Sequence, residues 1–126
     1  MKKKYIIITG GAGFVGSNLI ELFLKKTNYK IISIDDYSSG NKKNHIINPK
    51  VKYIKGSTSN IFKILKKYKK SIESLFHFGE FSRIFQSFKM FNRCYQSNSI
   101  GSQTVFKFCL ENKIRLIYSA TSARIN

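Results

Sequence analysis

The fold is decided by residues 5–16, which read Tyr-Ile-Ile-Ile-Thr-Gly-Gly-Ala-Gly-Phe-Val-Gly. The β-branched residues near the start favour a strand that is buried on both faces of a sheet. After the glycines, apolar residues recur with helical spacing at Val15, Leu19, Leu22 and Phe23. The predicted order is therefore a strand, a glycine-rich turn and a helix.

Three glycines of this turn each have a physical reason to be there. Gly10 permits a tight turn, Gly13 lets backbone approach a diphosphate, and Gly16 allows the helix to pack closely on its strand. The N–H groups of the first helical turn lack partners within the helix, so they and the helix dipole favour an anion. The turn thus predicts a dinucleotide site. Its Gly-x-x-Gly-x-x-Gly spacing differs from the commoner Gly-x-Gly-x-x-Gly, and a plain turn between strand and helix is the alternative.

An acidic residue ends the second predicted strand, which runs from Lys30 to Asp35. Asp35 lies about 20 residues beyond the glycine turn, where such folds place the carboxylate that binds the adenosine ribose hydroxyls. Asp35 and Asp36 are the only aspartates in a chain with 23 Lys and Arg. A negative charge is a poor neighbour for a 2′-phosphate, so the sequence favours NAD over NADP. The nearby Lys42 and Lys43 weaken this preference.

Strands and helices alternate along the rest of the chain. Strands are predicted at 5–9, 30–35, 51–55, 73–78 and 115–119, helices at 14–26, 58–70 and 97–112, and an irregular or helical segment at 83–93. This alternation predicts a parallel sheet with right-handed crossovers, in a doubly wound α/β fold with strand order 3-2-1-4-5. With 126 residues and 42% apolar residues, the chain is expected to form one domain with its own core.

The net charge of +17 raises the question of a nucleic-acid partner. The basic residues are mostly lysines, are dispersed along the chain and accompany an excess of Ile, Asn, Phe and Tyr, which is typical of an A/T-rich genome. The densest cluster, between Lys63 and Lys70, is interpreted as the solvated side of an amphipathic helix. We therefore expect no specific nucleic-acid partner.

Targeting and metal-binding signals are weak. Lys2 to Lys4 precede apolar residues as in a signal peptide, but that apolar stretch is too short, and no run approaches membrane-spanning length. Cys94 and Cys109 have neither metal-ligand nor Cys-x-x-Cys spacing. We expect a cytoplasmic protein with free buried thiols, without a metal site and without a membrane partner.

Five segments, in order, resemble the extended short-chain dehydrogenases, which include the NAD-dependent nucleotide-sugar epimerases and dehydratases, and in particular UDP-glucose 4-epimerase-like members. The segments are Thr9-Gly-Gly-Ala-Gly-Phe-Val-Gly-Ser-Asn-Leu19, Ile34-Asp-Asp-Tyr-Ser-Ser-Gly40, Leu75-Phe-His-Phe-Gly79, Asn98-Ser-Ile-Gly-Ser102 and Ile117-Tyr-Ser-Ala-Thr-Ser-Ala123. The resemblance implies a Rossmann-like NAD-binding domain over 1–126, a nucleotide-sugar substrate and a homodimer for the complete enzyme.

The resemblance also implies roles for individual residues. Those that would bind NAD are Gly10, Gly13, Phe14, Val15 and Gly16 at the pyrophosphate, Asp35 at the adenine ribose with Asp36 beside it, Ser57 and Thr58 after the third strand, Phe78 and Gly79 near the nicotinamide, and Asn98. Thr121 would hydrogen-bond the sugar oxygen undergoing oxidation, with an ordinary turn residue as the alternative. His77 fits a satisfied core histidine better than a catalytic one.

Two departures from the family pattern matter. Gly56-Ser57-Thr58 stands where the family usually has Gly-Asp, so Ser57 could replace the acid only as a weaker acceptor. Family catalysis uses a Tyr-x-x-x-Lys pair in which the Lys charge lowers the Tyr pKa, and none of the seven tyrosines has Lys four positions later.

The chain is accordingly expected to be the NAD-binding part of an epimerase or dehydratase, inactive alone because it lacks this pair. A catalytically inert dinucleotide-binding module, a truncated gene product and an NADP-linked reductase of the same superfamily are the alternatives.

Overall fold

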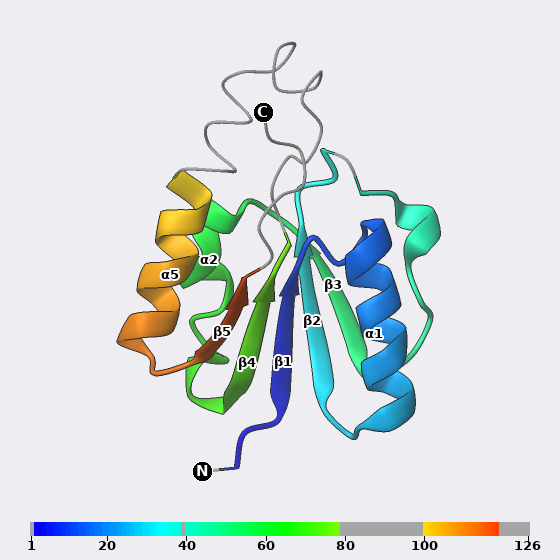
Figure 1. Ribbon diagram of the computed structural model, residues 1–126, viewed down its shortest axis with the longest axis horizontal. Coiled ribbons are helices and arrows are strands. Elements are labelled where there is room, and N and C mark those ends of the chain that lie inside the picture. The colour runs from blue at the N-terminus through cyan, green and yellow to red at the C-terminus, as the bar shows by residue number, and fades with distance from the viewer. Residues whose placement is uncertain (1, 39, 79–99, 119–126) are drawn as a thin grey trace.

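The computed structural model describes residues 2–38, 40–78 and 100–118, and its five strands form one parallel sheet (Figure 1). The strands are β1 (Tyr5–Thr9), β2 (Lys30–Asp35), β3 (Val51–Lys55), β4 (Ile72–His77) and β5 (Arg115–Tyr118). Their order is β3-β2-β1-β4-β5, and every pair of neighbours is parallel. The predicted doubly wound fold and its strand order are confirmed.

The apolar run at the start of the chain forms the central strand. Ile6, Ile7 and Ile8 of β1 are at most 2% exposed because successive side chains enter cores on opposite faces of the sheet. Ile7 packs in a cluster with residues of α2 (Ile61–Ile64) and α5 (Ser102–Glu111), whereas Ile6 and Ile8 pack with Ile20 of α1 (Phe14–Lys26). A strand buried on both faces explains why the sequence there is continuously apolar.

Helices cover both faces of the sheet (Figure 1). The helix α1 (Phe14–Lys26) covers one face, and α2 (Ile61–Ile64) and α5 (Ser102–Glu111) cover the other. The first predicted helix is confirmed, and α5 matches the described part of the predicted helix at 97–112. The predicted segment at 83–93 lies outside the described residues. Among the described helices, none has both the length and the apolar character needed to span a bilayer.

The helix predicted at 58–70 is wrong over most of its length. The structure has a 3₁₀ turn at Thr58–Asn60, only four residues in α2, and another 3₁₀ turn at Lys69–Ser71. The apolar face of the pattern is real, since Ile61 and Leu65 are fully buried. The range 58–70 contains five lysines, at 63, 66, 67, 69 and 70, and no acid, and like charges three or four positions apart disfavour a longer helix.

Candidate dinucleotide site

The glycine turn follows β1 at the carboxyl edge of the sheet. Gly10 has a φ of 75°, which L side chains rarely adopt, and its N–H donates to the carbonyl of Ile34 over 2.7 Å. Gly16 lies against the turn so closely that an added Cβ would stand 2.8 Å from Gly11 Cα. The turn therefore depends on glycine both for its conformation and for its contact with the helix.

The amino end of α1 faces out from this turn. Its first residues, Phe14, Val15 and Gly16, cannot find acceptors for their N–H groups within the helix, and the first turn carries no acidic residue. The side chains of Phe14 and Val15 are 82% and 57% exposed. Backbone amides without helical acceptors, beside exposed apolar side chains, suit a ligand that has both phosphate and ring groups.

The carboxylate of Asp35 braces the glycine turn. Its Oδ2 accepts the Ala12 N–H at 3.0 Å and its Oδ1 accepts the Tyr37 N–H at 2.8 Å. The side chain is only 8% exposed, and this burial raises the pKa of the carboxyl, although the two backbone hydrogen bonds oppose the shift. The remaining lone pairs of the carboxylate are available for further donors.

The residues predicted beside Asp35 lie at the same sheet edge. Asp36 is exposed, and its carboxylate accepts the Ser38 N–H at 2.9 Å. Gly56, which precedes Ser57, donates its N–H to the Asp35 carbonyl at 3.0 Å. The Ser57 hydroxyl accepts the Ser59 N–H at 3.2 Å, and Thr58 is 7% exposed. Ser57 therefore caps a 3₁₀ turn at the same sheet edge as Asp35.

Hydrogen bonds connect Phe78, which follows β4, to Thr9 at the end of β1. The Phe78 N–H donates to the Thr9 carbonyl at 3.1 Å and to the Thr9 hydroxyl at 2.8 Å. Phe78 is thereby held beside the start of the glycine turn. Three other predicted site residues, Gly79, Asn98 and Thr121, lie outside the described residues.

His77 is a buried structural residue in the described structure. Its side chain is fully buried, with Nδ1 2.7 Å from the Thr9 hydroxyl and Nε2 3.0 Å from the Ser102 hydroxyl. A neutral ring satisfies both contacts when Thr9 donates to Nδ1 and Nε2–H donates to Ser102. Burial lowers the pKa of His77 from 6.5 to about 4. The interpretation as a satisfied core histidine agrees with this geometry.

The sequence analysis missed the contacts that hold the loop between β2 and β3 over the glycine turn. Asn44 Nδ2 donates to the Ala12 carbonyl at 2.7 Å, and the Asn41 N–H donates to the same carbonyl at 3.0 Å. In the same loop, the Tyr37 hydroxyl lies 2.6 Å from His45 Nε2, and the His45 ring stacks on the Tyr53 ring with a centroid distance of 3.8 Å. The one sequence signal for this loop was the polar, glycine-containing composition of residues 38–41, which predicts irregular backbone.

Comparisons with known proteins agree with this geometry. The UDP-glucose 4-epimerase of Lactobacillus helveticus is 26% identical over 122 residues, which are 94% of this chain and 36% of that protein. The structure of Thermotoga maritima UDP-glucose 4-epimerase with UDP-glucose matches with a TM-score of 0.81 and 26% identity, over 93% of this chain and 38% of that one. The Bordetella bronchiseptica enzyme WbmG, solved in complex with NAD, shares the fold with a TM-score of 0.78 at 24% identity, over 93% of this chain and 37% of that one.

The chain thus spans little more than a third of the length of these relatives. The model of one family, described as the NAD dependent epimerase/dehydratase family, matches residues 6–125. This match includes nearly the whole chain, together with the glycine turn, the acid that ends β2 and the sheet that carries them. The chain belongs to the NAD-dependent epimerase/dehydratase family.

Proposed function

We propose that this chain is the NAD-binding part of a nucleotide-sugar epimerase or dehydratase. One observation carries the proposal: the glycine turn, the free amino end of α1 and the Asp35 carboxylate converge at the carboxyl edge of the sheet. In open α/β sheets, ligands bind outside the carboxyl ends of the strands. The family match and the NAD found in WbmG support the choice of ligand.

In this proposal, the backbone of Gly10, Gly13 and Gly16 lets the NAD diphosphate approach the amides of Phe14 and Val15. Asp35 and Asp36 accept hydrogen bonds from the adenosine ribose, while Ser57 and Thr58 border the adenine. Phe78 and Gly79 lie towards the nicotinamide, and Asn98 hydrogen-bonds within the same pocket. The two aspartates would repel a 2′-phosphate, so the chain prefers NAD to NADP.

NAD, when bound, supplies a hydride acceptor for the hydroxyl carbon of the sugar. Thr121 would orient the sugar hydroxyl, and the base that removes its proton would be a Tyr activated by a Lys. The 126 residues contain no Tyr-x-x-x-Lys. A positioned base contributes typically 10²–10⁴-fold, so we propose that the chain alone binds NAD without turning over a sugar.

Gly13 offers a clean test of the binding site. It has extended backbone, with φ −84° and ψ 179°, and an added Cβ would approach only the Gly10 carbonyl oxygen, at 3.3 Å. Gly13→Val should therefore fold but place a branched side chain in the path of the diphosphate. Calorimetric titration should show NAD binding to the wild-type chain and at least tenfold weaker binding to the variant.

Gln103→Val, at an exposed position of α5, is the matched control and should bind NAD like the wild type. Far-UV circular dichroism of all three proteins establishes that they are folded. Unchanged NAD affinity of folded Gly13→Val would refute the site, and tighter binding of NADP than of NAD would favour the reductase alternative. Turnover of UDP-glucose or dTDP-glucose by the 126-residue chain would refute its proposed inactivity.

A further inference from the structure

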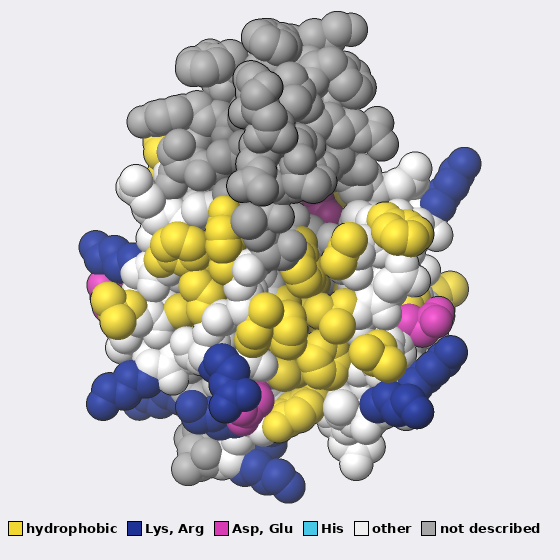
Figure 2. Space-filling model, in the orientation of Figure 1, with side chains coloured by type: hydrophobic (Ala, Val, Ile, Leu, Met, Phe, Trp, Pro, Cys, Tyr) yellow, Lys and Arg dark blue, Asp and Glu magenta, His cyan; other side chains and the backbone are white. Residues whose placement is uncertain are grey.

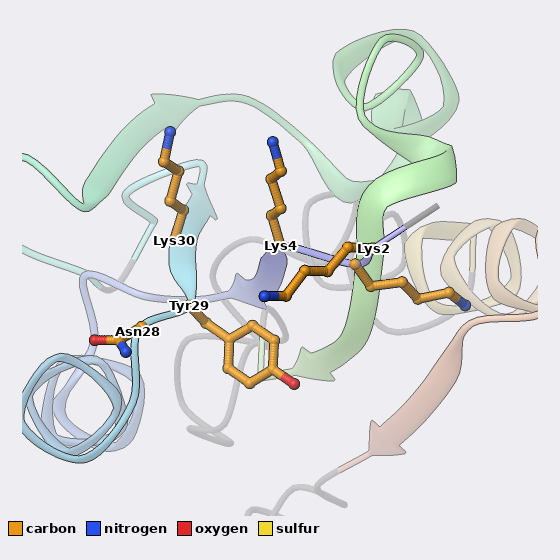
Figure 3. Close-up of a pocket in the computed structure, with 6 residues that line it drawn as sticks. Lys2, Lys4, Asn28, Tyr29 and Lys30 are labelled. Carbon is orange, nitrogen blue, oxygen red and sulfur yellow. The ribbon is translucent and has the colours of Figure 1, made fainter.

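A lysine-lined hollow lies at the amino edge of the sheet, opposite the glycine turn (Figure 3). Its volume is about 320 Å³, and it is lined by Lys2, Lys3, Lys4, Asn28, Tyr29 and Lys30. Backbone hydrogen bonds fix its walls, because the Lys30 N–H donates to the Lys4 carbonyl at 2.9 Å and the Lys4 N–H donates to the Ser71 carbonyl at 2.8 Å. Lys4 and Lys30 extend in the same direction from neighbouring strands.

The charge of this hollow is not neutralised in the described part of the chain. Its four lysines are exposed, and the ion pairs found there are Lys25 with Glu21 and Lys107 with Glu111, both on helices. Among the residues of the five strands, Glu73 of β4 is the one acid near an amino end. Neighbouring ammonium groups that outnumber the single carboxylate near them create a positive potential that attracts anions.

The parallel sheet extends this charge beyond the hollow. Each strand begins at or within two residues of a basic side chain: Lys4 at β1, Lys30 at β2, Lys52 at β3, Lys70 at β4 and Arg115 at β5. Lys50 also precedes β3, but its ammonium donates to the carbonyls of Leu24 and Thr27 at 3.2 and 3.0 Å. All five amino ends share one edge, and strands lie roughly 4.8 Å apart, so the row is about 19 Å long. In Figure 2 this amino edge is at the lower end of the molecule, and Lys and Arg side chains lie around it. Lysines that are dispersed in sequence are thus gathered in space.

We propose that this amino edge binds single-stranded nucleic acid, with the lysines on phosphates and Tyr29 as a stacking surface. A row of cations fits a polymer of phosphates better than one isolated phosphate. Tyr29 lines the same hollow, and its ring points away from the direction in which Lys4 and Lys30 extend (Figure 3). Aromatic rings near basic residues are typical of sites for single strands. The proposal departs from the expectation drawn from the sequence, which treated the lysines as dispersed charge.

Fluorescence anisotropy with a labelled oligouridylate of about 12 nucleotides tests the proposal over about 50 to 200 mM salt. Replacing Lys2, Lys3, Lys4 and Lys30 together by Gln should weaken binding at least tenfold. Each phosphate contact on a single strand contributes about 0.7 to the slope of log affinity against log salt, so the slope should fall by up to about 3. Tyr29→Leu, which retains an apolar side chain against the core, should weaken binding about tenfold.

The matched control replaces Lys42, Lys43, Lys55 and Lys63 by Gln, which removes the same charge from exposed positions outside the hollow. It should bind like the wild type, and thermal melts establish that all variants are folded. Equal losses in the two quadruple variants would overturn the proposal in favour of bulk charge. Binding to vesicles of phosphatidylserine and phosphatidylcholine without oligonucleotide binding would overturn it in favour of a membrane surface.

Discussion

His77 should make the stability of the fold depend on pH between about 6.5 and 4. In the unfolded chain the imidazole takes up a proton near pH 6.5, whereas burial lowers the pKa in the folded chain to about 4. The unfolded state therefore binds more protons in this interval, and the free energy of unfolding falls as the pH falls. A difference of about 2.5 units at 1.36 kcal/mol each gives a loss of about 3 kcal/mol by pH 4.

Asp35 acts in the opposite sense, because burial raises its pKa and acidification then favours the folded state through that group. The contribution of His77 must therefore be isolated by comparison with a variant. Urea unfolding at several pH values between 7 and about 4.5 should show that His77→Gln is less stable than the wild type at pH 7 but loses less stability on acidification. If the free energies of unfolding of the two proteins changed in parallel with pH, the reasoning would be refuted, since the buried ring would then contribute no proton uptake on unfolding.

Three further predictions concern single side chains. Asp35→Ala should lower the free energy of unfolding by about 2–3 kcal/mol in urea titrations, because the Ala12 and Tyr37 N–H groups lose a charged acceptor. The same variant should also bind NAD more weakly. Unchanged stability would contradict the role of Asp35 in supporting the glycine turn. Cys109 is buried, which raises its pKa to about 12, so in a Cys94→Ser background a disulfide reagent at pH 7 should react only after denaturant is added. Gly16→Ala should reduce the melting temperature by several degrees, because the new Cβ meets the backbone of the turn; a melt like that of the wild type would show that the turn can move.

The sheet was predictable because β1 and β2 carry nearly continuous apolar runs between clear turn residues. Ile6, Ile7 and Ile8 already specify a strand buried on two faces, and Asp35 marks where the next strand ends. The segment after β3 was not predictable in the same way, because Ile61 and Leu65 are spaced as on a helix although only Ile61–Ile64 is α-helical. Periodicity locates the buried face of an element but does not fix its length.

Some features of the candidate site could likewise be predicted from the sequence, and others could not. The glycine turn and Asp35 could be proposed as site residues from the sequence, because the backbone chemistry of a dinucleotide fold restricts which residues can stand there. The contact between Asn44 and Ala12 was not, since it joins residues 32 apart through a loop without periodicity. The buried link from Thr9 through His77 to Ser102 also depends on three elements meeting in space.

The two backbone bonds of Asp35 bear on any attempt to redesign the coenzyme choice of such a domain. An obvious exchange towards NADP would replace the acid and add an arginine for the 2′-phosphate. Here that exchange would also remove the carboxylate that accepts the N–H groups of both Ala12 and Tyr37, so the glycine turn would lose this support. A workable redesign would leave Asp35 in place and change the exposed Asp36, so that recognition changes while the scaffold stays intact.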